Sequence, residues 1–385
     1  MDTVNIGSVP PELLAFVLGT DGCTGAAFIG GGNYADDING IRLWRGDATP
    51  LGFGTGLEKV GLIARRLRTG CSRQPGHRDH ATPVPDYVAY VRKFAPRLER
   101  LKVALDAGCG AAGRLLHAIF AELAVELVPS HFEADGHNPF LGKRFPSQAV
   151  ATAVAGNVDE SGADLGAAID FAGERIAFFD ERGGLLRHDA AAGLIAAELL
   201  MRSPGACIAY DLRSTAALRA RVTRGEGTPV ALPTSPLAFA QHFRRNDALY
   251  AADQSGLHYF KDFWRFPSPF IALLTVCCHL SRERRPVSEL AADLNRFSQS
   301  GEIAIPVPTA EAAKDVLAKV RDEFRDAERE LIDGVTVRLE NWWFNLRQPG
   351  EAAELRLNVE GRSSRDERRG RQTVERLVAR FISEG

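Results

Sequence analysis

Two carboxylates and a guanidinium share one short turn near the middle of this 385-residue chain. The turn, residues 170–175, carries Asp170, Glu174 and Arg175 and lies between the apolar runs 165–169 and 176–179. These runs predict two short buried strands joined as a hairpin. Carboxylates at this spacing can hold a hard cation such as Mg²⁺, which takes oxygen ligands and keeps phosphate oxygens as partners. Turns also collect acidic residues for structural reasons, so a surface hairpin with solvated acids is the second interpretation.

A glycine-rich turn, residues 106–113, is the next candidate site. It reads GxGxxG and lies between the apolar run 101–105 and a predicted helix over 114–124. Such a turn lets the backbone approach a phosphate or a nucleotide at the helix N-terminus. It resembles the first motif of S-adenosylmethionine-dependent methyltransferases, which, like nucleotide-binding folds, place an acidic residue after the next strand. That strand ends here in Pro129-Ser130-His131, so we favour a packing role and keep the methyltransferase as an alternative.

The segment 65–85 is basic and rich in turn residues, and it carries Cys71, His77, Asp79 and His80. A structural zinc site needs four ligands in tetrahedral reach, and no second cluster supports one. We therefore interpret this segment as an interdomain connection.

Composition limits the remaining possibilities. Lys plus Arg number 47 and Asp plus Glu number 49, which gives a net charge of -2 and no reason to expect a nucleic-acid partner. The longest apolar run, 270–278, is too short to span a bilayer, and the first residues carry no signal peptide. Six cysteines are scattered without a CxxC pair. These features predict a cytoplasmic protein with reduced thiols and no membrane partner.

The acidic hairpin resembles the metal-binding loop of the alpha-D-phosphohexomutase family (phosphomannomutase/phosphoglucomutase). In that family, GADLG and a short strand lead into DGDGDR. Asp170, Gly173 and Arg175 agree with the motif, whereas its second Asp is Ala172 here and its third is Glu174. The resemblance implies a weakened Mg²⁺ site at Asp170 and Glu174, with Arg175 near a phosphate or sugar.

The resemblance extends to the segments around the family's active-site serine. VNIGSVPPELLAFVL and NGIRLWRGDATPLGFGTGLEKV are similar to the flanks of its TASHNP motif, which places the serine position at Gly32. Without a hydroxyl, the covalent step has no nucleophile. Losing the nucleophile costs about a million-fold in turnover in a well-studied hydrolase. The resemblance therefore implies no catalytic residue at this position.

The family's first domain also begins with a strand and a helix that this sequence lacks. The resemblance thus implies an open sheet edge or an uncovered apolar face in the first domain. We expect a second copy of the chain or a partner chain at that surface.

Three further motifs are altered in their chemical residues. Arg213 and Ser214 match the family's DVKxS strand, and the sugar-binding GExSG loop falls on residues 252–256, where Asp253 and Ser255 remain. An ordinary turn between two strands would look the same. In the phosphate loop Arg347 remains, but the hydroxyl positions are Pro349 and Glu351. Glu351 adds a negative charge where a phosphate dianion should bind, which opposes binding.

The resemblance covers nearly the whole chain and predicts its fold. We expect three consecutive α/β domains with mixed sheets, the first truncated, and a small C-terminal α+β domain around a central cleft. The predicted boundaries are 1–85, 86–204, 205–295 and 296–385. In the last domain, a helix is predicted from Ala310 to about Ile332, because Val316, Val320 and Phe324 share one face.

Three functions remain open. We favour a phosphohexomutase-like protein of carbohydrate metabolism that has lost catalysis and binds a partner protein or a hexose phosphate. The alternative is an active phosphohexomutase that interconverts hexose 1-phosphate and hexose 6-phosphate. It would need Ser72 or His77 as a replacement nucleophile, or a partner chain that completes the first domain. The methyltransferase is the third hypothesis.

Overall fold

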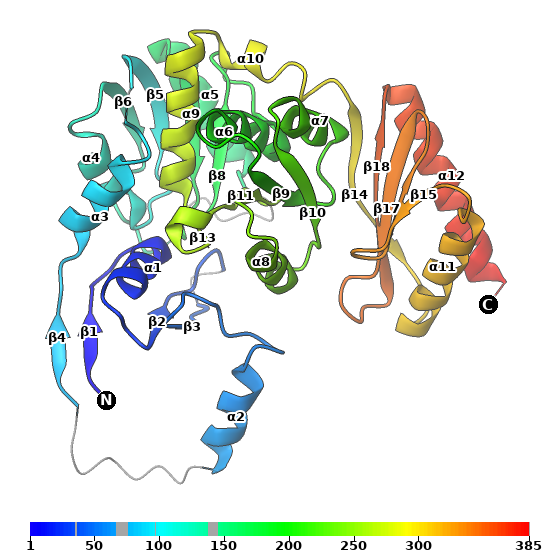
Figure 1. Cartoon of the computed structure of the whole chain (residues 1–385), viewed down its shortest axis with the longest axis horizontal. Coiled ribbons are helices and arrows are strands. Elements are labelled where there is room, and N and C mark those ends of the chain that lie inside the picture. Colours follow the sequence, from blue (N-terminus) through cyan, green and yellow to red (C-terminus); the bar gives the residue numbers. More distant parts are fainter. Residues whose placement is uncertain (35–36, 67–75, 97, 138–144, 385) are drawn as a thin grey trace.

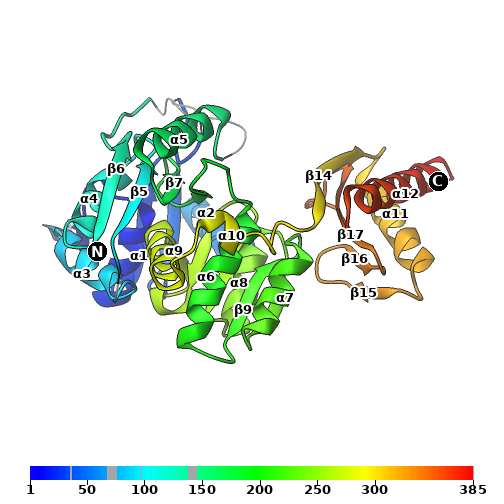
Figure 2. The same cartoon turned by 90° about the horizontal axis from the view of Figure 1, so that it is seen from above.

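The structure, a computed structural model, describes residues 1–34, 37–66, 76–96, 98–137 and 145–384. In the part of the chain described, the strands form two mixed sheets, one antiparallel sheet and two small two-stranded ladders. Figure 1 shows the antiparallel sheet and its two helices, in orange and red, to one side of the mixed sheets, and Figure 2 shows the same separation from above. The predicted fold class, several α/β domains followed by a small α+β domain, is confirmed.

The first part of the chain forms the two ladders. Its elements are β1 (Thr3–Asn5), α1 (Pro11–Thr20), β2 (Gly25–Ile29), β3 (Ile41–Arg45), α2 (Leu57–Arg66) and β4 (Arg78–His80). β1 pairs in parallel with β4, and β2 pairs antiparallel with β3. Helix α1 begins at a proline, whose fixed φ suits a first helical position, and its apolar residues enter the main core. Helix α2 buries no residue.

Large apolar side chains of this first part are exposed. They lie on β2, on β3, on α2 and between β3 and α2: Ile29, Ile41, Phe53, Leu62 and Ile63. The first part therefore presents apolar surface to solvent.

The first mixed sheet has the strand order β6-β5-β7-β8. Its elements are α3 (Val84–Arg92), β5 (Leu101–Asp106), α4 (Ala112–Phe120), β6 (Val125–Ser130), α5 (Gln148–Ser161), β7 (Leu165–Ile169) and β8 (Ile176–Phe179). β5 is parallel to β6 and β7, and β7 pairs antiparallel with β8. Every residue of β7 and β8 is buried, which confirms the predicted hairpin of buried strands. Both faces are covered, so the strands read as continuous apolar runs.

The second mixed sheet has the order β10-β9-β11-β12-β13. Its elements are α6 (His188–Arg202), β9 (Cys207–Asp211), α7 (Ala216–Arg224), β10 (Thr228–Leu232), α8 (Pro236–Arg245), β11 (Tyr250–Ala252), β12 (His258–Phe260), the 3₁₀ helix η1 (Lys261–Phe263), β13 (Phe266–Pro267), α9 (Pro269–Glu283) and α10 (Val287–Leu290). α6 and α9 pack together and are almost wholly buried. A helix that is apolar all round belongs in a core. None of the helices described has the length and apolar character of a membrane span.

The C-terminal sheet is antiparallel, with the order β14-β18-β17-β16-β15. Its elements are β14 (Ser298–Pro306), α11 (Ala310–Glu323), β15 (Glu328–Glu330), β16 (Val335–Arg338), β17 (Trp342–Arg347), β18 (Glu354–Gly361) and α12 (Ser364–Ser383). The predicted helix to about Ile332 was too long, because α11 ends at Glu323 and β15 then pairs with β16. Phe324 instead packs edge-on against Phe344, with ring centroids 5.2 Å apart.

The described residues form four clusters of buried apolar side chains, of which two are small and lie between the first mixed sheet and α5 and between the second mixed sheet and α8. The largest cluster joins α1, α3, the first mixed sheet and α9, through residues such as Leu13, Val91, Leu105 and Leu274. The C-terminal domain has its own core between its sheet and its two helices. The domains thus divide into one large packed unit and one small one.

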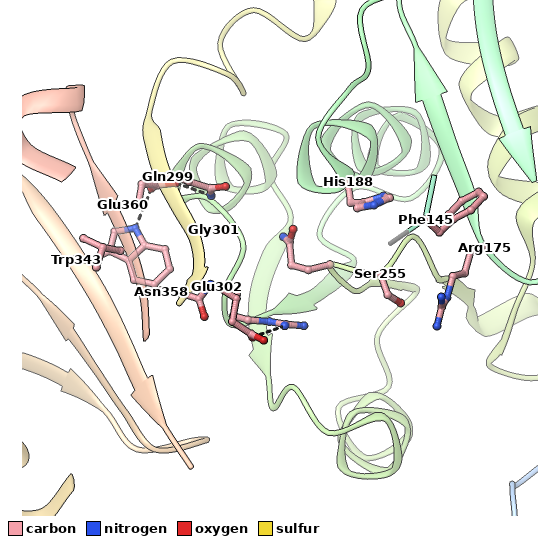
Figure 3. Close-up of a pocket in the computed structure, with 13 residues that line it drawn as sticks. Phe145, Arg175, His188, Ser255, Gln299, Gly301, Glu302, Trp343, Asn358 and Glu360 are labelled. Atoms are coloured by element: carbon pink, nitrogen blue, oxygen red, sulfur yellow. Dashed lines mark hydrogen bonds and ion pairs between the residues drawn. The ribbon is translucent and has the colours of Figure 1, made fainter. Parts of the chain in front are cut away.

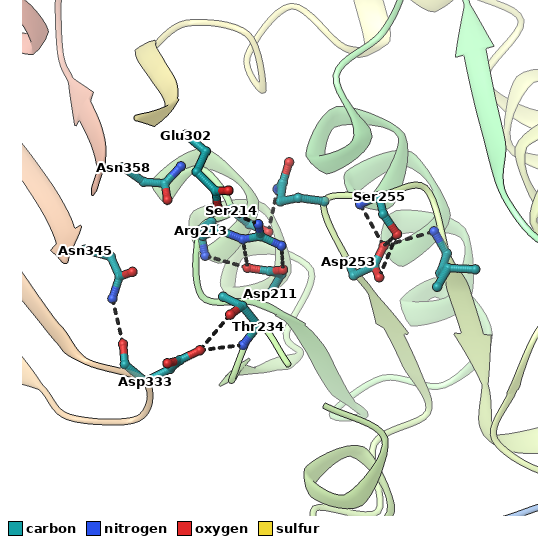
Figure 4. A network of polar contacts seen from close by, with 12 residues as sticks. Asp211, Arg213, Ser214, Thr234, Asp253, Ser255, Glu302, Asp333, Asn345 and Asn358 are labelled. Atoms are coloured by element: carbon teal, nitrogen blue, oxygen red, sulfur yellow. Dashed lines mark hydrogen bonds and ion pairs between the residues drawn. The ribbon is translucent and has the colours of Figure 1, made fainter. Parts of the chain in front are cut away.

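Polar contacts connect the second mixed sheet with the C-terminal domain (Figure 4). The backbone and side chain of Thr234 both donate to Asp333, at 3.0 and 2.7 Å. Arg213 donates to Glu302 at 3.1 Å, and the backbone nitrogen of Ala216 donates to Glu360 at 2.9 Å. This interface therefore holds the C-terminal sheet at the ends of β9 and β10.

A buried carboxyl connects α1 to α9. Glu12 is 1% exposed and accepts a hydrogen bond from Ser268, the residue that caps α9. Burial raises the pKa of Glu12 from 4.5 to about 8, and the bond from Ser268 only partly opposes this shift. The folded protein therefore keeps a proton that the unfolded chain releases, and its stability falls as pH rises through this window.

We predict that Glu12→Gln removes this pH dependence. The melting temperature of the wild type should fall between about pH 5 and pH 8.5, because its native state binds the extra proton over that range. The variant should melt nearly as the wild type does at the lower pH and above it at the higher pH. Thermal denaturation across this range tests the expectation, with the exposed Glu311→Gln as control. Parallel curves for wild type and Glu12→Gln would contradict it.

Candidate functional site

A cavity of about 480 Å³ opens between the two mixed sheets and the C-terminal sheet (Figure 3). One end receives side chains from the acidic turn, from the start of α6 and from the β11–β12 turn. The opposite end receives side chains from β14, β17 and β18. The lining residues are Phe145, Arg175, His188, Arg213, Gln254, Ser255, Gln299, Gly301, Glu302, Trp343, Asn358, Val359 and Glu360. The cavity therefore brings together residues from the ranges 145–188, 213–255 and 299–360.

The acidic turn is tightly bonded. Asp170 is 4% exposed, and its Oδ1 accepts from the backbone nitrogens of Glu174 at 2.8 Å and Arg175 at 3.1 Å. Its Oδ2 accepts from the side-chain amide of Asn33 at 2.8 Å. Burial raises the pKa of Asp170, and these donors oppose the rise. The carboxylate therefore organises its own turn and binds the loop that contains Gly32.

Glu174 has a partner from the first domain. Arg42 on β3 donates through Nη1 to both carboxylate oxygens of Glu174, at 2.7 and 2.9 Å. Burial raises the pKa of Glu174, while the guanidinium of Arg42 acts against that rise. Arg42 was not singled out from the sequence. The available signal was that Arg42 is a polar residue in the alternating strand 41–45, which follows the segment of the serine position.

The residue at the serine position lies beside this turn. Its neighbour Asn33 bonds to Asp170, so the loop carrying Gly32 is docked on the acidic turn. Gly32 has a φ of +59°, and a Cβ added there would meet no atom within 4 Å. The position faces open space and offers no hydroxyl.

At the opposite end, Arg213 and Glu302 line the cavity, and Arg347 lies behind them as a partner of Glu302. Arg347 is 5% exposed and donates to Asn358 at 3.0 Å and also to Glu302. Arg213 donates to Asp211 at 2.8 Å as well as to Glu302. Burial would raise the pKa of Glu302, but Arg347 and Arg213 hold it below its ordinary value. Of the three arginines predicted to bind phosphate or sugar, Arg213 and Arg347 are therefore already paired with carboxylates.

The predicted sugar loop also bonds internally. Asp253 accepts from the backbone and hydroxyl of Ser255, at 2.8 and 2.7 Å, and from the backbone of Leu257 at 3.0 Å. Its carboxylate thus caps the β11–β12 turn, and burial raises its pKa. Ser255 and Gln254 line the cavity, and Gln254 donates to the hydroxyl of Ser214 at 3.0 Å.

Most polar residues from β14 and β18 were missed. Glu360 accepts from Trp343 Nε1 at 2.8 Å and from Gln299 at 2.9 Å. In a regular strand, Gln299 and Glu302 would point to opposite faces. The pairing of β14 with β18 is irregular between them, so both line the cavity. The glycine within Ser300-Gly301-Glu302 was the available signal in the sequence, and Gly301 has a φ of +69° in the structure.

Other predicted chemical residues lie elsewhere. His77 is next to β4, with its Nε2 3.0 Å from Asp79, and Figure 1 shows β4 at the end of the molecule away from the C-terminal sheet. Cys71 and Ser72 lie outside the described residues. Glu351 is exposed and does not line the cavity.

The residues of the acidic turn do not fit a magnesium ion as the structure has them. Mg²⁺ requires an octahedron of oxygen atoms. Asp170 and Glu174 are engaged by nitrogen donors, and the position between them is Ala172. Over the described residues, no group of three or more His, Cys, Asp or Glu side chains gathers as metal ligands would.

The glycine turn is packed against neighbouring backbone on two sides. A Cβ at Gly110 would lie 2.2 Å from the carbonyl oxygen of Phe171, and one at Gly113 would lie 2.1 Å from that of Phe132. Gly108, at φ +64°, would similarly meet the carbonyl of Ile169. The acidic turn and the 131–137 segment thus occupy the faces that a nucleotide would need, which agrees with a packing role.

Comparisons with known proteins agree with this geometry. The family model "Phosphoglucomutase/phosphomannomutase, alpha/beta/alpha domain II" matches residues 85–184, and that of domain III matches 187–297. A phosphomannomutase of Salmonella typhimurium is 32% identical over 94% of this chain and 81% of its own length. A protein named phosphohexose mutases from Xanthomonas campestris is 30% identical over 94% of this chain and 81% of its own.

Solved structures share the fold. A phosphoglucomutase/phosphomannomutase family protein of Burkholderia thailandensis superposes with a TM-score of 0.85, at 24% identity, over 99% of this chain and 83% of its own. N-acetylphosphoglucosamine mutase of Aspergillus fumigatus, in complex with GlcNAc-6P and magnesium, superposes with a TM-score of 0.63. It is 12% identical and covers 97% of this chain and 92% of its own.

We predict that Gly110→Ala destabilises the protein by about 1–3 kcal/mol, because the new methyl group would overlap the backbone of the acidic turn. Urea unfolding measures this change. Gly136→Ala is the matched control, since a Cβ there meets no atom within 4 Å. Equal stability of the two variants would contradict the packing role of the turn.

Proposed function

Because the chain belongs to the phosphoglucomutase/phosphomannomutase family, we propose that it binds a hexose phosphate in the cavity without transferring its phosphoryl group. The observation that carries this proposal is Gly32, docked beside the acidic turn through Asn33 where the family resemblance implies a serine. A phosphoryl shuttle needs an oxygen nucleophile at this point.

Support for binding comes from the size and lining of the cavity. A volume of about 480 Å³ is in the range of small-molecule sites. Gln254, Gln299 and Asn358 offer amide groups for sugar hydroxyls, and Trp343 offers an apolar ring surface. Burial lowers the pKa of His188, which favours a neutral imidazole that can donate and accept.

Arg175 is the cation we assign to the phosphate. It lines the cavity, and its Nε lies 3.9 Å from Asp170 Oδ2, beyond hydrogen-bonding distance. Arg213 and Arg347 share Glu302, so a phosphate at their end would have to compete with that carboxylate. A monophosphate near Arg175, with the sugar directed toward Trp343, would contact the available cation and would avoid the carboxylate of Glu302.

The alternative, an active phosphohexomutase, is supported by the relatives named phosphomannomutase at 32% identity. Ser255 is the hydroxyl that lines the cavity, and its Oγ donates to Asp253. If transfer occurs, this hydroxyl is a better placed nucleophile than His77, which lies beside β4.

Two further elements belong to the proposal. The exposed apolar side chains of β2, β3 and α2 support an association surface there, for a second copy or a partner chain. The cysteines that the structure describes are free thiols, which supports a cytoplasmic location.

We predict no conversion of mannose 1-phosphate or glucose 1-phosphate to the 6-phosphate in phosphorus-31 NMR with excess protein, Mg²⁺ and a hexose bisphosphate. An active mutase in a parallel tube checks the reagents. Conversion proportional to the amount of protein would refute lost catalysis, and its disappearance in Ser255→Ala would identify the replacement nucleophile.

We predict saturable binding of glucose 6-phosphate or mannose 6-phosphate in isothermal titration calorimetry. Arg175→Gln should weaken it about tenfold or more, because a charge-assisted hydrogen bond to phosphate is lost. Arg182→Gln is the control, since this arginine is 77% exposed in the turn after β8. Absence of binding at millimolar sugar phosphate, or equal affinity of Arg175→Gln, would count against this site.

A further inference from the structure

We propose that the guanidinium of Arg42 takes the place of a divalent cation at the acidic turn, so that this chain holds the turn without metal. The inference does not depend on hexose phosphate binding. The carboxylates of Asp170 and Glu174 do not fit magnesium, so groups of the protein must balance their charge.

The contact between Arg42 and Glu174 has the form of a counter-ion contact. Nη1 of Arg42 lies 2.7 Å from one carboxylate oxygen of Glu174 and 2.9 Å from the other. Both oxygens that could bind a metal therefore face a positive charge already. The side chain of Glu174 is 17% exposed, so little water competes with Arg42 for its carboxylate. A second cation at this carboxylate would be repelled by the guanidinium.

The hairpin that carries Arg42 positions its guanidinium independently of Glu174. The guanidinium carbon lies 5.0 Å from the ring centre of Phe28, which is directly opposite on β2, and 5.5 Å from that of Trp44 on the same strand. Aromatic faces attract cations at such distances. Trp44 is buried and packs against Phe266 of β13, with ring centroids 5.9 Å apart. The rings of Phe28 and Trp44 thus fix the position of the Arg42 guanidinium, and Trp44 is itself held by packing.

The second carboxylate needs no metal either. Asp170 receives two backbone nitrogens and the amide of Asn33, which are donors that favour its ionised form. Arg175 lies in the same turn with its Nε 3.9 Å from Asp170 Oδ2, so its charge also faces this carboxylate although it makes no hydrogen bond to it. The charge that a divalent cation would neutralise is therefore already neutralised by the protein itself.

This contact also connects two domains. Arg42 and Glu174 are 132 residues apart, and their pairing joins the β2–β3 hairpin to the turn between β7 and β8. Asn33 adds a second connection from the same hairpin's loop to Asp170. In this arrangement the first domain, and not a metal ion, orders the turn.

The test compares the full-length wild type with Arg42→Gln, Glu174→Gln and the double variant. Unfolding is measured in EDTA and again with MgCl₂ or MnCl₂, and bound Mn²⁺ is measured by electron paramagnetic resonance. In EDTA, Arg42→Gln should lower the folding equilibrium constant about tenfold or more, and adding Glu174→Gln should restore much of it. The wild type should bind no Mn²⁺ and show no melting shift with either metal, whereas Arg42→Gln should gain stability with metal.

Arg45→Gln is the matched control, because this arginine of the same strand donates to the backbone carbonyl of Thr55 instead. It should behave as the wild type in every metal condition. Metal-dependent stabilisation of the wild type that Asp170→Asn abolishes would overturn the proposal. Arg42→Gln with wild-type stability in EDTA and no response to metal would also overturn it. If Arg42→Gln does not fold, the comparison is made between the wild type and Glu174→Gln. Stabilisation by metal of the wild type but not of Glu174→Gln would reject the proposal. No stabilisation of either protein by metal would support it.

Discussion

The buried carboxylate of Asp170 is the interaction on which the rest of the site depends. It closes the acidic turn through the backbone nitrogens of Glu174 and Arg175 and docks the neighbouring loop through Asn33. The glycine turn fits beneath this backbone because a side chain at Gly110 would overlap Phe171. β8 is joined to the next loop by a bond from the nitrogen of Ile176 to the carbonyl of Gly256. A single desolvated acid therefore joins the acidic turn to the loop that carries Gly32, and the backbone of the same hairpin contacts the glycine turn and the β11–β12 turn.

Most charged side chains of the site have partners of opposite charge within the protein. Arg42 pairs with Glu174, and Arg213 and Arg347 share Glu302. Desolvated ions of one sign are costly unless partners lie close, and these residues find their partners within the protein. The framework of a phosphohexomutase is kept under these conditions, because buried strands and glycine contacts depend on packing and not on chemistry. The fold alone therefore does not fix the activity.

The sequence predicted the parts whose cause is local. The buried hairpin of β7 and β8 and the packing of the glycine turn follow from apolar runs and small residues. It could not predict the pairing of Arg42 with Glu174, because that contact depends on how two distant domains dock. The predicted helix beyond Glu323 failed for a similar reason: pairing of β15 with β16 outweighed the helical pattern. Asp253 resembles a sugar ligand in sequence, yet its turn uses it as a cap.

The separate core of the C-terminal domain has a thermodynamic consequence. That domain keeps its own apolar interior, while its connections to the second mixed sheet include bonds such as Thr234 to Asp333 and Arg213 to Glu302. Ion pairs at the edge of a cavity weaken as ionic strength rises, whereas apolar cores do not. Calorimetry at high salt should therefore resolve two endotherms, one for the large unit and one for the C-terminal domain. A single free energy of unfolding would then describe neither unit.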